Sequence, residues 1–267
     1  MSISKNSADA LEKRRIQLQR QHRLMRHAAM KRAERDYSAM LREKIPAGTR
    51  EDLEWAFTLA FSLVFEQGEE IIRKTYSSKK LEQKFIACDL ALRTEGNEKS
   101  FESSRRLSNA GNMLMTTLEG LGLGALGIGI PDIILFVAML LRGVYETAQQ
   151  YGFGCSSRED KLYILCLLEC AMCSGTDWIK ADAHVDEVAD IDHIPHRTEI
   201  KEQMQRSAAA FASDLLILKF IQGLPVVGLI GGLGNPLYYR RVISYAELKY
   251  QQRYVKNAIA KEKAVED

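Results

Sequence analysis

The stretch that decides the fold is GLGLGALGIGIPDIILFVAMLL, residues 120–141, in which Asp132 is the single charged residue. A second stretch, GLPVVGLIGGLGNPLYY over residues 223–239, carries no charge. Segments 120–129 and 223–234 together hold ten of the chain's 18 glycines. Each interior glycine costs a helix about 1 kcal/mol relative to alanine, so such density is tolerated where close backbone packing compensates. We therefore expect two glycine-rich apolar helical hairpins.

Both stretches carry glycines at the spacing that lets helices approach closely. The Gly-x-x-x-Gly pairs are Gly120/Gly124 and Gly228/Gly232. Two environments stay open: a buried hairpin in a soluble core, or segments that enter or lie on a bilayer. A membrane span needs about 20 apolar residues. Pro131 interrupts the first stretch and the second is shorter than that, which favours broken or re-entrant helices over two clean spans.

The first stretch also contains a literal dinucleotide fingerprint, Gly122-x-Gly124-x-x-Gly127, with Glu146 at the distance where a ribose-binding acid belongs. That motif works only between a strand and a helix N-terminus, because the strand positions the phosphate-binding turn. The flanking residues have helical character, and no alternating strand pattern occurs in the chain. We interpret the match as a consequence of glycine density and predict no bound cofactor.

Upstream, residues 8–44 contain no Gly or Pro and are rich in strong helix formers. Residues 1–45 carry 12 Lys/Arg against five Asp/Glu, although the whole chain has a net charge of only +2. This pattern predicts one long basic helix that ends before Pro46. Three uses of such a helix stay open: attraction to anionic lipid, nucleic-acid binding, which we regard as the weakest, and a solvated arm or coiled coil.

The other segments also show helical periodicity, and the fold class we predict is all-α: a multi-helix bundle with two glycine-rich hairpins and a long basic N-terminal helix. One helix is expected to start at Thr49, whose side chain is placed to cap it with Asp52 three residues on. A polar loop is expected over 94–104. The further helices are expected at 81–92, 142–151, 158–173, 203–221 and 240–263.

Aromatic rings and cations follow the second glycine-rich stretch directly. Such side chains suit the headgroup layer of a bilayer, where one end is apolar and the other wet. We therefore predict a membrane-interface group made of Tyr238, Tyr239, Arg240, Arg241 and Tyr245.

The chemistry-bearing residues do not form a recognisable catalytic motif, and an enzyme is not indicated by the sequence. Cys166, Cys170 and Cys173 share one helix face and, with His184 or the pair His193/His196, have the elements of a zinc site. Because they sit among leucines, a core face of small thiols is the better interpretation, and no metal is predicted. We interpret the acids Asp182, Asp186, Glu187, Asp190 and Asp192 as a solvated loop.

Two blocks of the chain resemble the EcsC family. They are residues 122–153, with a glycine-rich run, a Pro-Asp step and a Tyr-Gly turn, and residues 219–254, with Leu-Pro, small apolar residues and a Tyr/Arg helix. The positions that match the family pattern are Gly124, Gly127, Pro131, Asp132, Tyr151, Gly152, Pro225, Gly228, Asn235 and Arg240. The resemblance divides the chain into a basic arm, 1–48, and an EcsC-like helical domain, 49–267.

The resemblance implies a bacterial helical protein that is cytoplasmic or attached to the inner face of the membrane, near an ABC transporter. It transfers no catalytic residue. Asp132 and Asn235 are the polar candidates, because a polar side chain in an apolar segment needs a partner.

The function we expect is association with cytoplasmic membrane lipids, peripherally or through re-entrant apolar segments, and assistance to a transporter. The odd number of cysteines and an N-terminus without an apolar signal segment agree with a cytoplasmic location. Two alternatives stay open. One is a soluble helical enzyme or small-molecule binder that uses the Asp132 region, and the other is an adaptor with a basic arm.

Overall fold

A computed structural model describes residues 5–34, 47–68, 72, 78–95, 130–221 and 236–266. No strand occurs in these ranges, which confirms the predicted all-α class. The elements are α1 (Lys5–Glu34), α3 (Ala47–Leu63), a π-helical turn η1 (Val64–Gly68), α5 (Ser78–Glu95), α7 (Ile130–Gln150), α8 (Arg158–Met172), α9 (Gly175–Ala189), α10 (Arg197–Ile221) and α11 (Pro236–Glu266).

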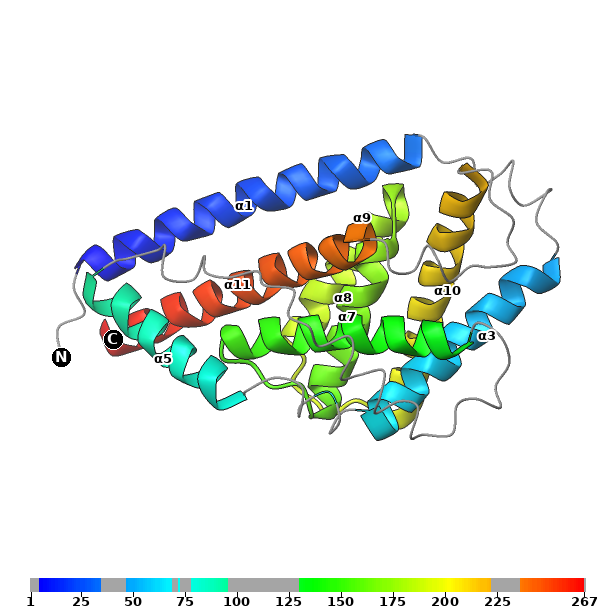
Figure 1. Ribbon diagram of the computed structural model, residues 1–267. Coiled ribbons are helices and arrows are strands. Elements are labelled where there is room, and N and C mark those ends of the chain that lie inside the picture. The colour runs from blue at the N-terminus through cyan, green and yellow to red at the C-terminus, as the bar shows by residue number, and fades with distance from the viewer. Residues whose placement is uncertain are drawn as a thin grey trace.

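The core lies between α7, α8, α10 and α11, with α3 packed on α7 and α10 (Figure 1). Ten of the fifteen residues of α8 are buried, because the helix packs on α9, α10 and α11 at once. Aromatic rings fill the junction of α3, α7 and α10: the ring centroid of Phe211 lies 5.4 Å from that of Phe57 and 6.2 Å from that of Phe136. Offset and edge-to-face ring pairs of this kind add to the stability that apolar burial supplies.

Helix α1 runs antiparallel to α11 along one side of the bundle. The C-terminal half of α1 also contacts α9 (Figure 1). Its inner side carries the buried residues Ala10, Leu11, Leu18 and Ala29, spaced so that they share one helix face. The basic N-terminal segment is therefore packed on the bundle over residues 5–34 and does not stand apart from it. Residues 35–44, which the sequence assigned to the same helix, lie outside the described residues.

Several predicted boundaries shift. Helix α3 begins at Ala47, two residues before Thr49, so Thr49 lies inside the helix and does not cap it. Residues 142–151 do not form a separate helix, because α7 continues from Ile130 to Gln150. The glycine-rich segments 120–129 and 223–234, expected as hairpins, lie outside the described residues. None of the helices in the described ranges has the length and apolar character that crossing a membrane requires.

The turn after α7 depends on one glycine. Gly152 has φ +78°, a backbone conformation that residues other than glycine rarely adopt. A Cβ atom there would lie 2.6 Å from Cζ of Phe85 on α5. The turn then leads into Ser157, whose hydroxyl accepts the backbone N–H of Asp160 at 3.0 Å, while the Asp160 carboxylate accepts that of Ser157 at 3.2 Å. This reciprocal cap fixes the start of α8.

Candidate functional site

Two buried charged residues, one from α9 and one from α11, form the centre of the candidate site. Lys249 is 1% exposed and Asp182 is 7% exposed. Burying such charges is costly unless they are paired. Nζ of Lys249 lies 2.8 Å from Oδ1 of Asp182 and 2.7 Å from Oδ1 of Asp186, so the ammonium is balanced by two carboxylates.

Asp182 receives hydrogen bonds from two further side chains. The hydroxyl of Tyr245 donates to Oδ1 at 2.6 Å, and Nε2 of His22 lies 2.8 Å from Oδ2. Helical spacing explains the convergence, because residues four apart lie one above the other on a helix face. Asp182 and Asp186 are four apart on α9, and Tyr245 and Lys249 are four apart on α11.

An indole completes the group. Trp178 is 3% exposed and precedes Asp182 by one turn of α9. Its ring centroid lies 5.6 Å from that of His22 and 6.1 Å from that of Tyr245. We call this set the charged cluster; its members are His22, Trp178, Asp182, Asp186, Tyr245 and Lys249.

The electrostatics of the charged cluster hold Asp182 in its ionised form. Burial by itself raises the pKa of this carboxyl, but the hydrogen bond from His22 and the charge of Lys249 outweigh it and lower the pKa to about 2. Burial raises the pKa of Tyr245 well above its usual value, and the nearby Asp182 adds to this effect. The tyrosine therefore stays a hydroxyl donor toward a permanent carboxylate.

As it stands, the charged cluster joins three helices. Asp182 accepts hydrogen bonds from α1 and α11, and Lys249 of α11 pairs with both Asp182 and Asp186 of α9. The carboxylate and the ammonium are both occupied by protein partners, and α1 lies over them. The geometry is that of a charged junction between α1 and the bundle.

The cysteines behave as core residues, as the sequence indicates for the α8 face. Cys166 and Cys170 are buried and reduced. Burial raises the pKa of both thiols, and that of Cys173 to about 12, so they stay protonated and poorly nucleophilic at neutral pH. Within the described ranges, no group of three or more His, Cys, Asp or Glu residues is arranged to hold a metal ion.

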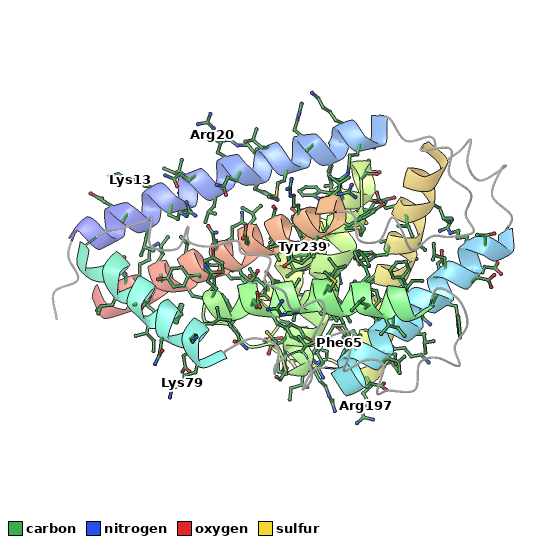
Figure 2. All side chains as sticks on the ribbon, viewed as in Figure 1. Lys13, Arg20, Phe65, Lys79, Arg197 and Tyr239 are labelled. Carbon is green, nitrogen blue, oxygen red and sulfur yellow. The ribbon has the colours of Figure 1, made fainter. Side chains whose placement is uncertain are left out.

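A second feature is the outer face of α1, which we define as Lys13, Ile16, Arg20, Arg23, Leu24, His27 and Lys31. All seven side chains are exposed, and their spacing of three and four residues places them on one side of the helix. Figure 2 shows Lys13 and Arg20 directed away from the bundle. Ile16 is 53% and Leu24 64% exposed, so two aliphatic side chains lie among four cations.

No acidic residue interrupts this basic surface. Residues 13–32 contain eight Lys/Arg and no Asp or Glu. Glu12, at the edge, is engaged by Arg15, whose Nη2 lies 2.5 Å from Oε1 of the glutamate. In the part of the chain that the structure describes, the four cations of the outer face form no ion pair. Among the residues that the structure describes, no carboxylate neutralises the charge of this surface.

The predicted membrane-interface residues are mostly turned into the protein. Tyr238 and Tyr245 are buried, and the Tyr245 hydroxyl belongs to the charged cluster. Arg241 pairs with Asp214 at 2.8 Å and lies over the ring of Tyr238. Tyr239 is half-buried and Arg240 is exposed. The rings of Tyr238 and Tyr245 therefore pack in the core of this structure, and the membrane-interface role of the group stays a prediction.

The acidic segment also differs from the prediction. Asp182, Asp186 and Glu187 do not lie in a loop; they belong to α9, while Asp190 caps it and Asp192 follows it. The hydrophobic residues Trp178, Val185 and Val188 interleave with these acids and bury one side of the helix. Asp182 lies on that buried side. The dense charges around it are typical of an exposed segment, so its burial was not apparent from the sequence.

The remaining predicted site residues divide into two groups. Tyr151 is buried, and its hydroxyl accepts a hydrogen bond from Nε2 of Gln251 at 2.6 Å. Gly152 forms the turn described above. Pro131 and Asp132 lie in the first turn of α7, where the structure describes the backbone. The others lie outside the described residues: Gly120, Gly124, Gly127, Pro225, Gly228, Gly232 and Asn235.

Sequence reasoning missed His22, Trp178 and Lys249. The signal for Lys249 was its place in the Tyr245-x-x-x-Lys249 pair on an otherwise apolar helix face. For His22 the signal was its alignment with Leu18 and Met25 on the apolar side of α1, a place where a polar residue needs a partner.

The fold and these surfaces define an all-helical bundle protein with a basic helix docked through a charged junction. The chain matches the EcsC protein family over residues 10–255 and belongs to that family. The match begins within α1, so the resemblance extends further toward the N-terminus than the two sequence blocks indicated. No curated protein and no solved structure matches the chain.

Proposed function

We propose that this protein binds the anionic surface of the cytoplasmic membrane peripherally, through the outer face of α1. The observation that carries the proposal is the exposed basic stripe of Lys13, Arg20, Arg23 and Lys31 with Ile16 and Leu24 between its cations. Basic side chains near an anionic leaflet contribute about 1 kcal/mol each, and the aliphatic side chains add burial at the headgroup boundary.

The shape of the surface supports the same function. The stripe extends over residues 13–31, about 27 Å at the rise of an α-helix, and one straight helix presents all of it. A bilayer is a flat, extended anionic surface, so every cation of the stripe can meet headgroups at once. Four cations give about 4 kcal/mol, which is enough for reversible, salt-sensitive binding and too little for permanent anchoring.

The test is flotation of the full-length protein with phosphatidylglycerol-containing vesicles. The stripe variant removes four charges from the outer face: Lys13→Gln, Arg20→Gln, Arg23→Gln and Lys31→Gln. The control variant removes four exposed charges elsewhere: Lys79→Gln, Arg158→Gln, Arg197→Gln and Lys201→Gln. Lys79 and Arg197 lie on the side of the molecule opposite α1 (Figure 2).

We expect the stripe variant to lose at least about tenfold in vesicle partitioning and the control variant to keep most of it. Glutamine keeps helix propensity close to that of Lys and Arg, so circular dichroism of both variants should match that of the wild type. Equal losses in the two variants would show that total charge, and not the stripe, governs binding. If the wild type does not float, the proposal is wrong.

A further inference from the structure

Helix α1 buries few apolar side chains against the bundle. Between residues 8 and 33, the buried apolar side chains of α1 are Ala10, Leu11, Leu18 and Ala29, of which two are large. Helix α8 is half as long and buries ten residues. Regions with few buried apolar contacts open at lower free energy than the core, so α1 is less restrained by packing than the core helices α7, α8, α10 and α11.

Polar contacts supply much of the remaining attachment. His22 reaches Asp182, Nη2 of Arg14 donates to Oε1 of Gln251 at 2.5 Å, and Nη2 of Arg32 donates to the carbonyl of Cys173 at 2.6 Å. Such bonds exchange with bonds to water at a small net free energy. They fix the position of α1 without making its release prohibitive.

The charged cluster is largely complete without α1. When His22 leaves, Asp182 keeps the Tyr245 hydroxyl and the Lys249 ammonium, and Lys249 keeps Asp186. Release of α1 therefore exposes a pre-paired surface of two acids, a lysine and the Trp178 and Tyr245 rings. Little uncompensated charge is created, which lowers the cost of opening.

We propose that α1 is a detachable helix: it undocks from α9, α11 and α5 as a unit, exposing the charged cluster, and anionic membranes favour the undocked state. The coupling rests on the proposed function. It arises because undocking frees the inner residues Leu11, Leu18 and Met25, which a bilayer binds only when they have left the bundle. A ligand shifts an equilibrium only through such a difference in affinity between the two states.

The first test is hydrogen–deuterium exchange of the full-length protein without lipid. We expect amides of α1 to exchange faster than those of α7 and α8, through local opening. His22→Ala should raise exchange across α1 by about tenfold or more, because the bond to the Asp182 carboxylate is charge-assisted. Gln19→Ala, an exposed position on the same helix, should leave it unchanged. Exchange of α1 and α8 at one common rate would overturn undocking.

The second test uses Trp178 as reporter. The protein has two tryptophans, and Trp55→Phe removes the exposed one, leaving the buried indole beneath α1. We expect acrylamide quenching of Trp178 to increase at least about twofold when the protein binds phosphatidylglycerol vesicles, since a buried indole is barely accessible.

Flotation in the same samples separates the two proposals. Floating protein with unchanged quenching would overturn the coupling and leave the membrane function intact. Protein that does not float would overturn the membrane function and the coupling together, and the exchange result alone would then decide whether α1 undocks.

Discussion

At the scale of the residue, Asp182 is the polar side chain of the charged cluster whose hydrogen bonds and ion pair connect three helices, α1, α9 and α11. It is the point where donors from α1 and α11 meet α9. Removing the carboxylate leaves the Lys249 ammonium buried with Asp186 alone, and that partner is exposed to water on its other side. The penalty for a partly unpaired buried charge exceeds the value of any one hydrogen bond.

Asp182→Ala should therefore lower the free energy of unfolding by about 3 kcal/mol, in the range found when one partner of a buried ion pair is removed. Chemical denaturation monitored by circular dichroism measures it. Asp192→Ala, at a fully exposed side chain three residues beyond α9, is the matched control and should change stability by less than about 0.5 kcal/mol. A loss of similar size in both variants would contradict a structural role of the charged cluster.

The low pKa of Asp182 also predicts the acid dependence of stability. Because its pKa falls from 3.8 in the unfolded chain to about 2 in the fold, the carboxylate stabilises the fold above pH 4. That stabilisation decreases as the pH falls toward 2, by about 1 kcal/mol between pH 5 and pH 3. Asp182→Asn should show a correspondingly smaller loss over this interval in urea titrations. An identical pH profile for the two proteins would show that Asp182 titrates normally.

At the scale of the element, the turn between α7 and α8 packs closely against Phe85 of α5. Gly152→Ala puts a Cβ atom against the Phe85 ring in a backbone conformation that alanine resists, so we expect a loss of about 1–2 kcal/mol in stability. Gly48→Ala, at a position with no atom within 4 Å, should be neutral or slightly stabilising. Thermal unfolding of the two variants side by side measures the difference.

The elements were predictable from sequence to different degrees. Helix α8 was predicted almost to the residue, because a continuous apolar run over residues 162–168 forms its centre. Helix α9 was mistaken for a loop, because six acidic residues over 177–192 hid the period of Trp178, Val185 and Val188. Charge density and burial are independent properties of a helix, and local composition reports only the first.

At the scale of the whole molecule, the family resemblance and the all-α class were available from sequence, but the candidate site was not. Its members come from residues 22, 178–186 and 245–249, and only the packing of α1 on α9 and α11 brings them together. Tyr245 was singled out for a lipid-facing role, while its hydroxyl is committed to Asp182. A single sequence shows which side chains are polar and periodic; it does not show which helices meet.

The whole-molecule charge distribution gives the last prediction, which concerns how the protein is held at a membrane. If the outer face of α1 carries the binding, flotation with anionic vesicles should fall steeply between about 50 mM and 500 mM salt, because ions screen exposed charges over a few ångströms. Vesicles of phosphatidylcholine alone should retain little protein. Binding through apolar segments such as 120–129 and 223–234 would instead persist in high salt and in the stripe variant, since apolar burial does not depend on charge. A salt-resistant wild type would therefore move the membrane contact from α1 to those segments.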